Sequence, residues 1–373
     1  MTATDLKTHW KFHWLTRWEE IWDEGFVRQW QAWLDESPSA HVFFHPAMVK
    51  AWMETYLPLR DLLPCFLIAE SAAHIVFFPL VFWRRNWKNA FQKLLIPVGY
   101  SDYDYHDPIV VGLKTEESIG MNSFWADFIV ELQRVSGPIY FDRLILDGIR
   151  QLVAGEGKSW TPGDTCPWAD LRPFERPEAF LPSLKTSLRG DLRRQERRIN
   201  EVGKLAYNVF TRGMIEQALQ ELHPFLAAHA RRWPAAYKPP HLHENIVVRS
   251  MEAGLLHFST LKIGDESAAW HLGFVFRDRY YYYLPAQEEQ FERLSPGKVL
   301  LLKCIEQAII NRLSIYDFLR GEESYKAGWT DNTEQLFNLK LDNKKMLSKN
   351  RNAIVDRIRP MLMKGIMFDK GRL

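Results

Sequence analysis

The residues best suited to chemistry in this chain lie in the stretch IYDFLRGEESYKAGW, residues 315–329. Its first five residues have the apolar character of a buried strand, yet Asp317 lies among them. A buried carboxylate is too costly to leave unpaired, so we expect Arg320 or Lys326 to pair with it. We expect Lys326, which lies between aromatic residues, to present a positive charge that steadies developing negative charge or a donor phosphate. A purely structural Asp–Arg or Asp–Lys pair explains Asp317 equally well.

A second cluster surrounds Pro285, which follows a tyrosine-rich strand in the run RYYYYLPAQ. Proline has no N–H to donate to a neighbouring strand, so pairing is expected to fail there and to open a cleft. The later Ser295-Pro296-Gly297-Lys298 predicts a capped helix start whose free N–H groups suit a phosphate. An ordinary well-made helix start is the alternative. The expected donor-binding residues are Leu284, Ala286, Ser295, Pro296, Gly297, Lys298 and Arg320.

His271 is the candidate base. In the strand SAAWHLGFVF, alternation places it on one face with Ala269, Gly273 and Val275, whose small side chains leave room for a ligand. Its imidazole ordinarily titrates near neutral pH, as a general base requires. A hydrogen-bonded structural histidine is the alternative. The expected catalytic residues are Lys326, His271, Asp317 and Tyr325.

The run SDYDYHDP, residues 101–108, is the other polar and aromatic cluster. Its spacing fits no established metal loop, so we predict no metal here and favour a hydrogen-bonded loop that closes the first sheet. We further predict that this loop borders the acceptor site between the two units. The expected acceptor-binding residues are Asp102, Tyr103, Tyr105, His106 and Trp329.

Two segments carry concentrated positive charge, although the net charge of the chain is only +2. Arginines form two rows at helical spacing over residues 187–201, which indicates either a solvated face or a site for a polyanion such as tRNA, a nucleotide-linked sugar or anionic lipid. Residues 339–373 contain ten Lys/Arg and three Asp/Glu. The helix expected there suits a membrane surface, or packing on the second domain, which we favour. Nothing indicates a DNA-binding protein.

Length and composition indicate a two-domain globular protein of 373 residues. The three cysteines are isolated and form neither a disulfide framework nor a metal-binding spacing. The N-terminal sequence lacks the apolar run of a signal peptide, and runs such as 75–83 are far shorter than the roughly 20 residues of a membrane span. We therefore expect a cytoplasmic protein, either free or at the inner face of the membrane.

An internal similarity predicts two related α/β units. LLPCFLIAESAAHIVFFPLVF and LLHFSTLKIGDESAAWHLGFVF share a leucine pair, a strand-like run, Glu-Ser-Ala-Ala and a second strand, so each indicates a β-hairpin. A His-Pro pair that opens a helix precedes each segment. Chance similarity between apolar strands is the alternative. We place the units at 1–175 and 176–373, with a proline-rich loop over 161–183 between them, and expect mainly antiparallel sheets flanked by helices.

Several motifs in order resemble a known family. SLKTSLRGDLRRQERRI, YYYYLPA, LSPGKVLL and IYDFLRGEESYKAGW resemble the GNAT-fold acyltransferase domain of the CelD/BcsL type, over about residues 183–330. FFHPAMVKAW, FPLVF and SDYDYHDPIV resemble the N-terminal half of that family. The paired arrangement is similar to the Fem-type transferases with two GNAT-like units, whose Phe-Lys motif matches Tyr325-Lys326 here, with Tyr in place of Phe.

The resemblance implies acyl transfer to an amine or hydroxyl of a small-molecule, glycan-linked or lipid-linked precursor of the cell envelope or an exopolysaccharide. Acyl-CoA is the first choice of donor. Aminoacyl-tRNA is the alternative, because the usual CoA-binding glycine loop is replaced by Leu-Ser-Pro-Gly-Lys and the arginine rows suit a polyanion. A non-catalytic scaffold that binds a precursor or partner is the third hypothesis, since fold alone does not fix chemistry.

Overall fold

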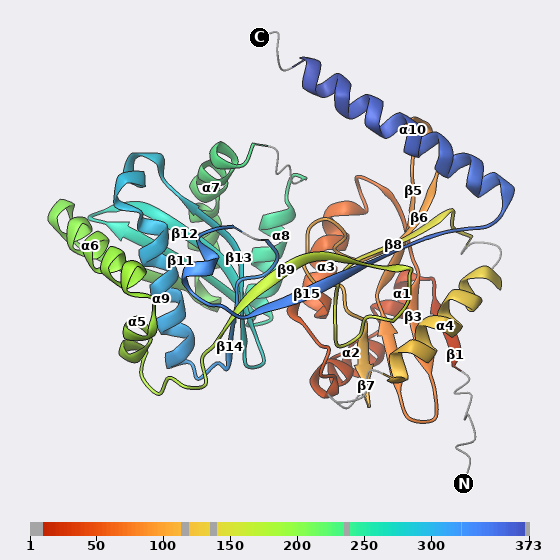
Figure 1. Cartoon of the computed structure of the whole chain (residues 1–373), viewed down its shortest axis with the longest axis horizontal. Coiled ribbons are helices and arrows are strands. Elements are labelled where there is room, and N and C mark those ends of the chain that lie inside the picture. Colours follow the sequence, from red (N-terminus) through yellow and green to blue (C-terminus); the bar gives the residue numbers. More distant parts are fainter. Residues whose placement is uncertain (1–9, 113–118, 135–139, 235–238, 322, 370–373) are drawn as a thin grey trace. The chain divides into compact units, whose positions relative to one another are not determined.

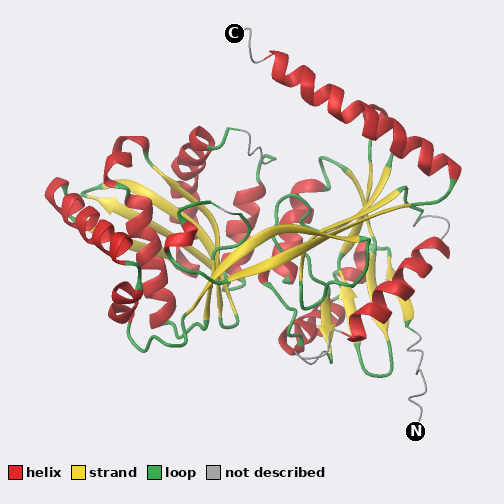
Figure 2. Ribbon diagram, viewed as in Figure 1, coloured by secondary structure: helices red, strands yellow, loops and turns green. Residues whose placement is uncertain are grey.

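The computed structural model comprises two compact units (Figure 1). The structure describes residues 10–112, 119–134, 140–234, 239–321 and 323–369, without the side chains of 119, 120 and 358–369. Unit 1 consists of residues 1–49, 56–163 and 336–373, and unit 2 of residues 50–55 and 164–335. In each unit, strands are flanked by helices (Figure 2).

Unit 2 is built on the strand order β10-β11-β12-β13-β14-β9. All neighbours are antiparallel except β13 and β14, which are parallel. The strands are β9 (Trp160–Asp170), β10 (Leu205–Phe210), β11 (Leu256–Ile263), β12 (Glu266–Phe276), β13 (Arg279–Gln287) and β14 (Ile315–Asp317). The helices are α5 (Phe180–Ser183), α6 (Thr186–Val202), α7 (Ile215–Arg232), α8 (Leu242–Glu252) and α9 (Pro296–Ile310), with short 3₁₀ turns η4 (Pro177–Ala179), η5 (Arg212–Met214), η6 (Glu289–Leu294) and η7 (Lys326–Gly328).

Different helices pack on the two faces of this sheet. On one face, α6 and α9 pack apolar side chains such as Leu192 and Ile305 against a core that includes Tyr280 and Tyr316. On the other face, the ring of Phe225 of α7 is tilted against the rings of Phe258 and Trp270. The helix α9 is apolar almost all round, as expected for a helix buried beneath a sheet. The candidate site described below lies on the α9 side.

Unit 1 contains a small sheet, β1-β3-β4-β7, and the strand order β15-β8-β6-β5-β2. Its strands are β1 (Lys11–Leu15), β2 (Asp61–Pro64), β3 (Phe66–Glu70), β4 (Ile75–Phe78), β5 (Leu80–Arg84), β6 (Lys93–Pro97), β7 (Ile109–Val111), β8 (Arg143–Arg150) and β15 (Thr333–Asp342). Its helices are α1 (Trp18–Ile21), α2 (Glu24–Glu36), α4 (Ile119–Arg134) and α10 (Met346–Asp369), with 3₁₀ turns η1 (Val42–Phe44) and η2 (Trp87–Asn89). The helix α3 (Pro46–Tyr56) begins in unit 1, but its residues 50–55 group with unit 2.

The end of the chain groups with unit 1, which differs from the expected division at residue 175. β15 pairs antiparallel with β8 from Leu336↔Arg150 to Asp342↔Arg143. The start of α10 is hydrogen-bonded to Asp142, immediately before β8. The expectation that the basic C-terminal helix packs on the second domain is therefore corrected. The reason is that β15 leads the chain back to β8 before α10 begins.

The repeated segments do form hairpins. β3 and β4 pair antiparallel in unit 1, and β11 and β12 do so in unit 2. The His-Pro pairs, however, are not equivalent, because Pro46 opens α3 whereas Pro224 lies inside α7. The fold class, α/β with mixed, mainly antiparallel sheets, is confirmed. Among the described residues, no helix is both long and apolar enough to cross a membrane.

Candidate active site

The parallel strands β13 and β14 pair over only three residues. The pairs run from Arg279↔Ile315 to Tyr281↔Asp317, where β14 ends. β13 continues to Gln287 with β12 alone beside it. The chain turns sharply after β14, because Leu319 takes a left-handed backbone conformation with φ of 58°. The predicted parting of two strands is confirmed, but it begins four residues before Pro285, which lies on the stretch left with one neighbour.

The ladder between β12 and β13 fixes which backbone groups face this opening. Glu288 donates its N–H to the carbonyl of Ala268 at 2.9 Å. Since hydrogen-bonded pairs alternate along an antiparallel ladder, the N–H groups of Leu284 and Ala286 also point at β12. These two N–H groups are therefore directed away from the opening, and a role for Leu284 and Ala286 in donor binding stays a prediction. Gln287, which the sequence interpretation missed, directs its N–H to the open side.

The start of α9 lies beside the same stretch of β13. Ser295 occupies the N-cap position, but its left-handed backbone, with φ of 49° and ψ of 50°, leaves its side chain without a capping hydrogen bond. Gln287 takes that role, since its side-chain oxygen accepts from the N–H of Gly297 at 3.2 Å. Lys298 donates its N–H to the Ser295 carbonyl. The predicted serine cap is wrong, and a phosphate at this helix start would have to displace Gln287.

Two further groups at the mouth of the opening are ion-paired. The Lys298 ammonium donates to Asp191 of α6 at 2.8 Å, and this hydrogen bond lowers the pKa of Asp191. Asp317 is completely buried and accepts from Arg279 at 2.7 Å and from the N–H of Leu319 at 2.8 Å. Arg279 therefore plays the part expected of Arg320 or Lys326. This pair could not be predicted from the sequence, because Arg279 and Asp317 lie on different strands.

Lys326 is a buried clamp on the loop that follows β14. Its Nζ lies 3.4, 2.9 and 3.4 Å from the carbonyl oxygens of Leu319, Arg320 and Gly321. It also lies 2.8 Å from the Glu323 carboxylate. With four oxygens around the ammonium and 3% of the residue exposed, the charge is enclosed rather than presented. Arg320 itself lies 3.5 Å from Asp164 through its Nε.

A buried cluster of imidazoles and phenols lies beneath β13. The hydroxyl of Tyr280 is 2.8 Å from Nδ1 of His257 and 3.0 Å from Nδ1 of His271. The ring of His271 stacks on Tyr282 with centroids 4.1 Å apart. Burial lowers the pKa of His257 to about 4 and holds that of His271 well below its usual range. Both histidines are therefore neutral at pH 7.

Tyr325 links this cluster to the clamped loop. It lies beside Tyr282, and burial raises the pKa of both phenols. Nε2 of His271 is buried without a hydrogen-bond partner, and so is the hydroxyl of Tyr316, which stacks on Tyr280. The predicted catalytic residues His271 and Tyr325 thus belong to one connected cluster. Lys326 follows Tyr325 directly but makes its own separate contacts.

His257, His271 and Cys304 are the metal-ligating side chains that the described residues bring together, with their ligand atoms within 4.8 Å of one another. The Tyr280 hydroxyl already bridges the two Nδ1 atoms, and burial raises the pKa of the Cys304 thiol to about 11. A metal would have to displace that hydroxyl and bind a thiolate that burial disfavours. The arrangement fits a hydrogen-bonded cluster better than a metal centre.

The predicted acceptor loop in unit 1 is buried and internally bonded. Asp102 accepts from Tyr56, and Tyr103 donates to the carbonyl of Met48 at 2.9 Å. The Nδ1 of His106 lies 2.9 Å from the carbonyl of Asp147. The guanidinium of Arg150 stands over the ring of Tyr105, its carbon 4.9 Å from the ring centroid. Trp329, in unit 2, is buried in the core. A role for these residues in acceptor binding stays a prediction.

Part of the chain that forms this site matches a known protein family. Residues 186–327 match the family described as "Acetyltransferase (GNAT) domain". This segment runs from α6 to the clamped loop, so it contains β13, β14 and α9. The match indicates that this segment is an N-acyltransferase domain. No curated protein matches the sequence.

Solved structures share the fold over most of the chain at low identity. FemX superposes with a TM-score of 0.60 at 10% identity, covering 84% of this chain and 95% of FemX. A protein of unknown function from Bacteroides thetaiotaomicron gives 0.54 at 10% identity, covering 85% and 97%. The C-terminal domain of a protein described as a lysylphosphatidylglycerol synthetase, from Agrobacterium fabrum, gives 0.52 at 12% identity, covering 89% and 95%.

Proposed function

We propose that the protein transfers an acyl group from acyl-CoA to an amine or hydroxyl of a cell-envelope or exopolysaccharide precursor. The observation that carries this proposal is the three-residue pairing of β13 and β14 inside the segment that matches the acetyltransferase domain. Beyond Tyr281, one edge of β13 is left without β14. An extended, amide-containing donor such as the arm of acyl-CoA fits such an edge, because it can form strand-like hydrogen bonds.

The reaction places specific demands on the groups at this edge. The acceptor nitrogen or oxygen forms a bond to the acyl carbon, the carbon–sulfur bond breaks, and the acceptor's proton ends on the released thiol. The negative charge that develops on the acyl oxygen requires a fixed donor, and the N–H of Gln287 is directed to the open side. Neutral His271 is the candidate base for the acceptor's proton, with Tyr280 and His257 hydrogen-bonded behind it.

The candidate residues therefore divide by role. Asp317, buried with Arg279, and Lys326, enclosed by loop carbonyls, are positioning residues that hold the mouth of the opening. Lys298 and Gly297 lie at the start of α9, where a donor phosphate would compete with Gln287. Tyr325 lies beside Tyr282, which stacks on His271, and we assign it to contact with the acceptor.

The acceptor class rests on fold relatives. FemX and the lysylphosphatidylglycerol synthetase domain both superpose above a TM-score of 0.5. The name lysylphosphatidylglycerol describes an aminoacyl group carried on a lipid. An envelope precursor with an amine or hydroxyl is the acceptor class that these relatives favour.

Aminoacyl-tRNA is the second candidate donor, and the exposed arginines of α6 favour it. Arg193, Arg194 and Arg197 all lie on the exposed side of this helix. Arg194 and Arg197 have acidic neighbours, so the row is only partly neutralised. Contacts to phosphates would make binding fall steeply with salt.

The test is a donor screen on the purified protein. Acetyl-CoA and longer acyl-CoAs are incubated with amine-bearing envelope precursors, and the free thiol and the acylated product are measured by absorbance and mass spectrometry. Charged tRNA is tested in parallel at low and high salt. We expect thiol release with acyl-CoA that depends on the acceptor. Turnover with charged tRNA alone would replace the first donor with the second, and turnover with neither donor contradicts the proposal.

A further inference from the structure

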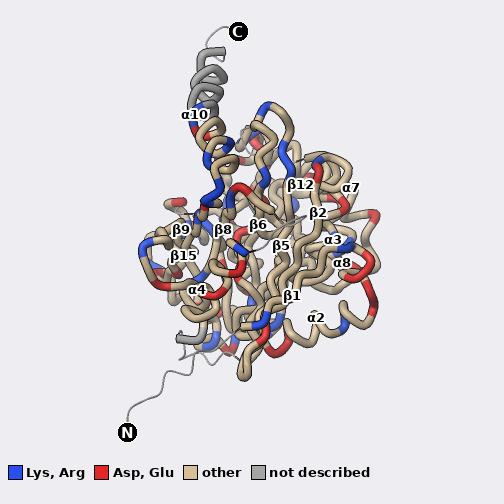
Figure 3. The backbone as a smooth tube through the Cα atoms, turned by 90° about the vertical axis from the view of Figure 1, so that its right-hand side faces the viewer, with Lys and Arg blue, Asp and Glu red and all other residues tan. Residues whose placement is uncertain are grey.

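Unit 1 carries a surface where basic and apolar side chains are exposed together. Residues 84–93 (RRNWKNAFQK) form the end of the β5–β6 hairpin, and residues 344–351 (KKMLSKNR) lead into α10. Each segment contains four Lys/Arg and no Asp/Glu. We call these two segments together the basic-aromatic surface. Figure 3 shows the blue positions at the start of α10.

Buried polar contacts hold the two segments side by side. Asp142, which is fully buried, accepts from the N–H of Lys93 at 2.8 Å and from the hydroxyl of Ser348 at 2.6 Å. The side chain of Gln92 donates to Asn352 at 2.6 Å. These contacts join the hairpin end directly to the first turns of α10. The surface is therefore a built feature of unit 1, not two independent loops.

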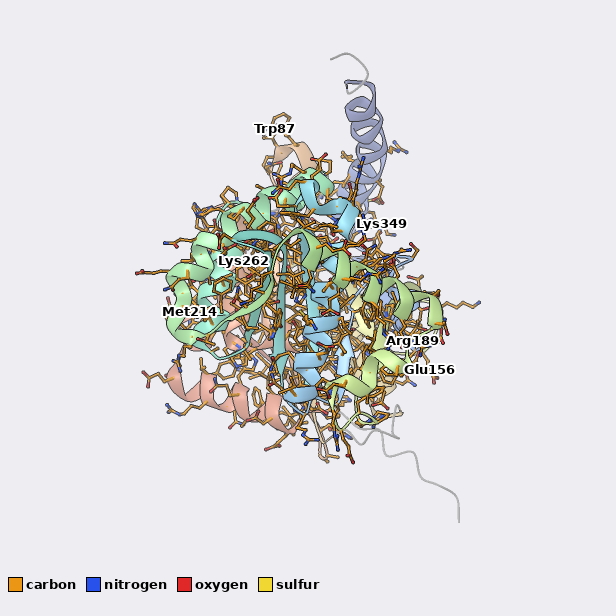
Figure 4. The ribbon with its side chains drawn as sticks, turned by 90° about the vertical axis from the view of Figure 1, so that its left-hand side faces the viewer. Trp87, Glu156, Arg189, Met214, Lys262 and Lys349 are labelled. Carbon is orange, nitrogen blue, oxygen red and sulfur yellow. The ribbon has the colours of Figure 1, made fainter. Side chains whose placement is uncertain are left out.

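Large apolar side chains project from this surface. Trp87 is 70% exposed, Phe91 61% and Met346 74%. Figure 4 shows the Trp87 ring directed away from its own ribbon. The turn that carries Phe91 has a costly backbone conformation, because Ala90 and Phe91 both have positive φ, at 52° and 51°. The remaining exposed large apolar member is Leu347.

We propose that the basic-aromatic surface docks the protein on anionic lipid membranes. Exposed Trp and Phe side chains insert at the boundary between headgroups and acyl chains, and surrounding Lys and Arg attract anionic lipid. Arginine and lysine alone would suit nucleic acid as well. The four apolar side chains at positions 87, 91, 346 and 347 favour the membrane, because insertion gains from removing them from water. This proposal does not depend on the identity of the acyl donor.

The test measures vesicle binding by the full-length protein without any acyl donor. Co-sedimentation compares phosphatidylcholine vesicles with vesicles that contain 30% phosphatidylglycerol, at two salt concentrations. We expect binding to the anionic vesicles that weakens with salt. The double variant Lys88→Gln/Lys349→Gln is expected to weaken it about 25-fold, since each basic residue near such a surface contributes about fivefold. Trp87→Ser/Phe91→Ser is expected to weaken it by about tenfold or more.

Matched controls separate docking from general charge and folding. Trp233→Ser removes an exposed tryptophan of unit 2, and Lys158→Gln removes an exposed lysine of unit 1 outside the surface. Neither is expected to change vesicle binding, and all variants are checked for an unchanged Tm. Equal binding by wild type and both double variants would overturn the proposal. The proposal would also be overturned if the wild type bound vesicles only at background level and bound tRNA in a way that the same double variants weaken.

Discussion

At the scale of single residues, the buried histidines of unit 2 tie stability to pH. His257 and His271 are neutral in the folded protein and share the hydroxyl of Tyr280. Each becomes exposed, and regains an ordinary pKa near 6.5, when the chain unfolds. Since the folded pKa lies below the unfolded one, the unfolded chain binds more protons in the interval between them.

We predict that the free energy of unfolding is greatest above about pH 6.5 and falls as the pH drops toward 4. Each histidine contributes a slope of about 1.4 kcal/mol per pH unit in this interval. Urea unfolding of wild type and His257→Gln between pH 7 and pH 5 measures the difference, with exposed His223→Gln as the control. A slope that His257→Gln leaves unchanged would show that this imidazole does not stay neutral in the folded protein.

Lys326 has a structural role that a substitution can separate from a chemical one. The Nζ of Lys326 closes a loop in which Leu319 and Gly321 both have positive φ. Lys326→Met leaves three carbonyls and the Glu323 carboxylate without this partner. We predict a loss of about 2 kcal/mol of stability or more, together with lower activity. Thermal unfolding and kcat/KM are measured on the variant, and on Lys298→Met, whose ion pair is partly exposed.

The two roles give different results. If Lys326 only positions the loop, activity lost in Lys326→Met tracks stability and recovers at low temperature. If its charge acts on the reaction, kcat stays low at a temperature where the variant is fully folded. An unchanged Tm together with unchanged turnover would contradict both roles.

At the scale of elements, the site depends on how β13, β14 and α9 meet. Gln287 belongs to β13 by its backbone and to the start of α9 by its side chain. A donor phosphate at this helix start would take the place of its side-chain oxygen. We therefore expect the junction of β13 and α9, rather than the helix end alone, to set the strength of donor binding.

We predict that Gln287→Ala costs about 1 kcal/mol of stability, because the N–H of Gly297 loses its acceptor. Adding CoA is expected to raise the Tm of this variant more than that of wild type, since the ligand no longer displaces the glutamine. Differential scanning fluorimetry measures both increments. Gln290→Ala, an exposed glutamine three residues later, is the control. Equal increments in all three proteins would place the donor phosphate elsewhere.

The sequence predicted the elements that carry their own signal and missed those set by distant contacts. The hairpins, α6 with its end at Gly203 and the helix after Pro296 follow from alternation, helical spacing and caps. β9 was expected to be loop because it contains Pro162 and Pro167, yet it pairs with β14. Pairing with β14 stabilises β9 as a strand, and the local strand propensity of the sequence does not reveal such a partner.

The site shows the same limit. Asp317 and His271 were found because a polar residue in an apolar strand is visible in the sequence. Arg279, His257 and Cys304 were not, because each becomes a neighbour only when separate strands and α9 pack together. Gln287 was overlooked because the direction of its N–H depends on which residue pairs of β12 and β13 are hydrogen-bonded, and the sequence does not show this. Residue type thus predicted one member of each interacting pair, and the other member could be identified only from the packing of the fold.

At the scale of the whole molecule, the chain does not divide into two consecutive domains. β15 completes unit 1 by pairing with β8, and α10 follows it there. Arg143, which is 4% exposed, donates to Asp342 of β15 and Asp356 of α10 at 3.0 and 2.8 Å. A cut at the expected boundary therefore removes both ion-pair partners of a buried guanidinium.

We predict that a fragment of residues 1–175 does not unfold cooperatively, whereas residues 1–163 joined by a short Gly/Ser linker to 336–373 do. The first fragment exposes the edge of β8 and leaves Arg143 without Asp342 and Asp356, so it loses both the strand pairing and these ion pairs. Circular dichroism during thermal unfolding and size-exclusion chromatography compare the two fragments. Adding a separate 333–373 peptide to the first fragment is expected to restore part of the transition. A cooperative transition at the same temperature in both fragments would mean that β15 and α10 rest on unit 1 without stabilising it, and the grouping of the C-terminal segment with unit 1 would then have no energetic meaning.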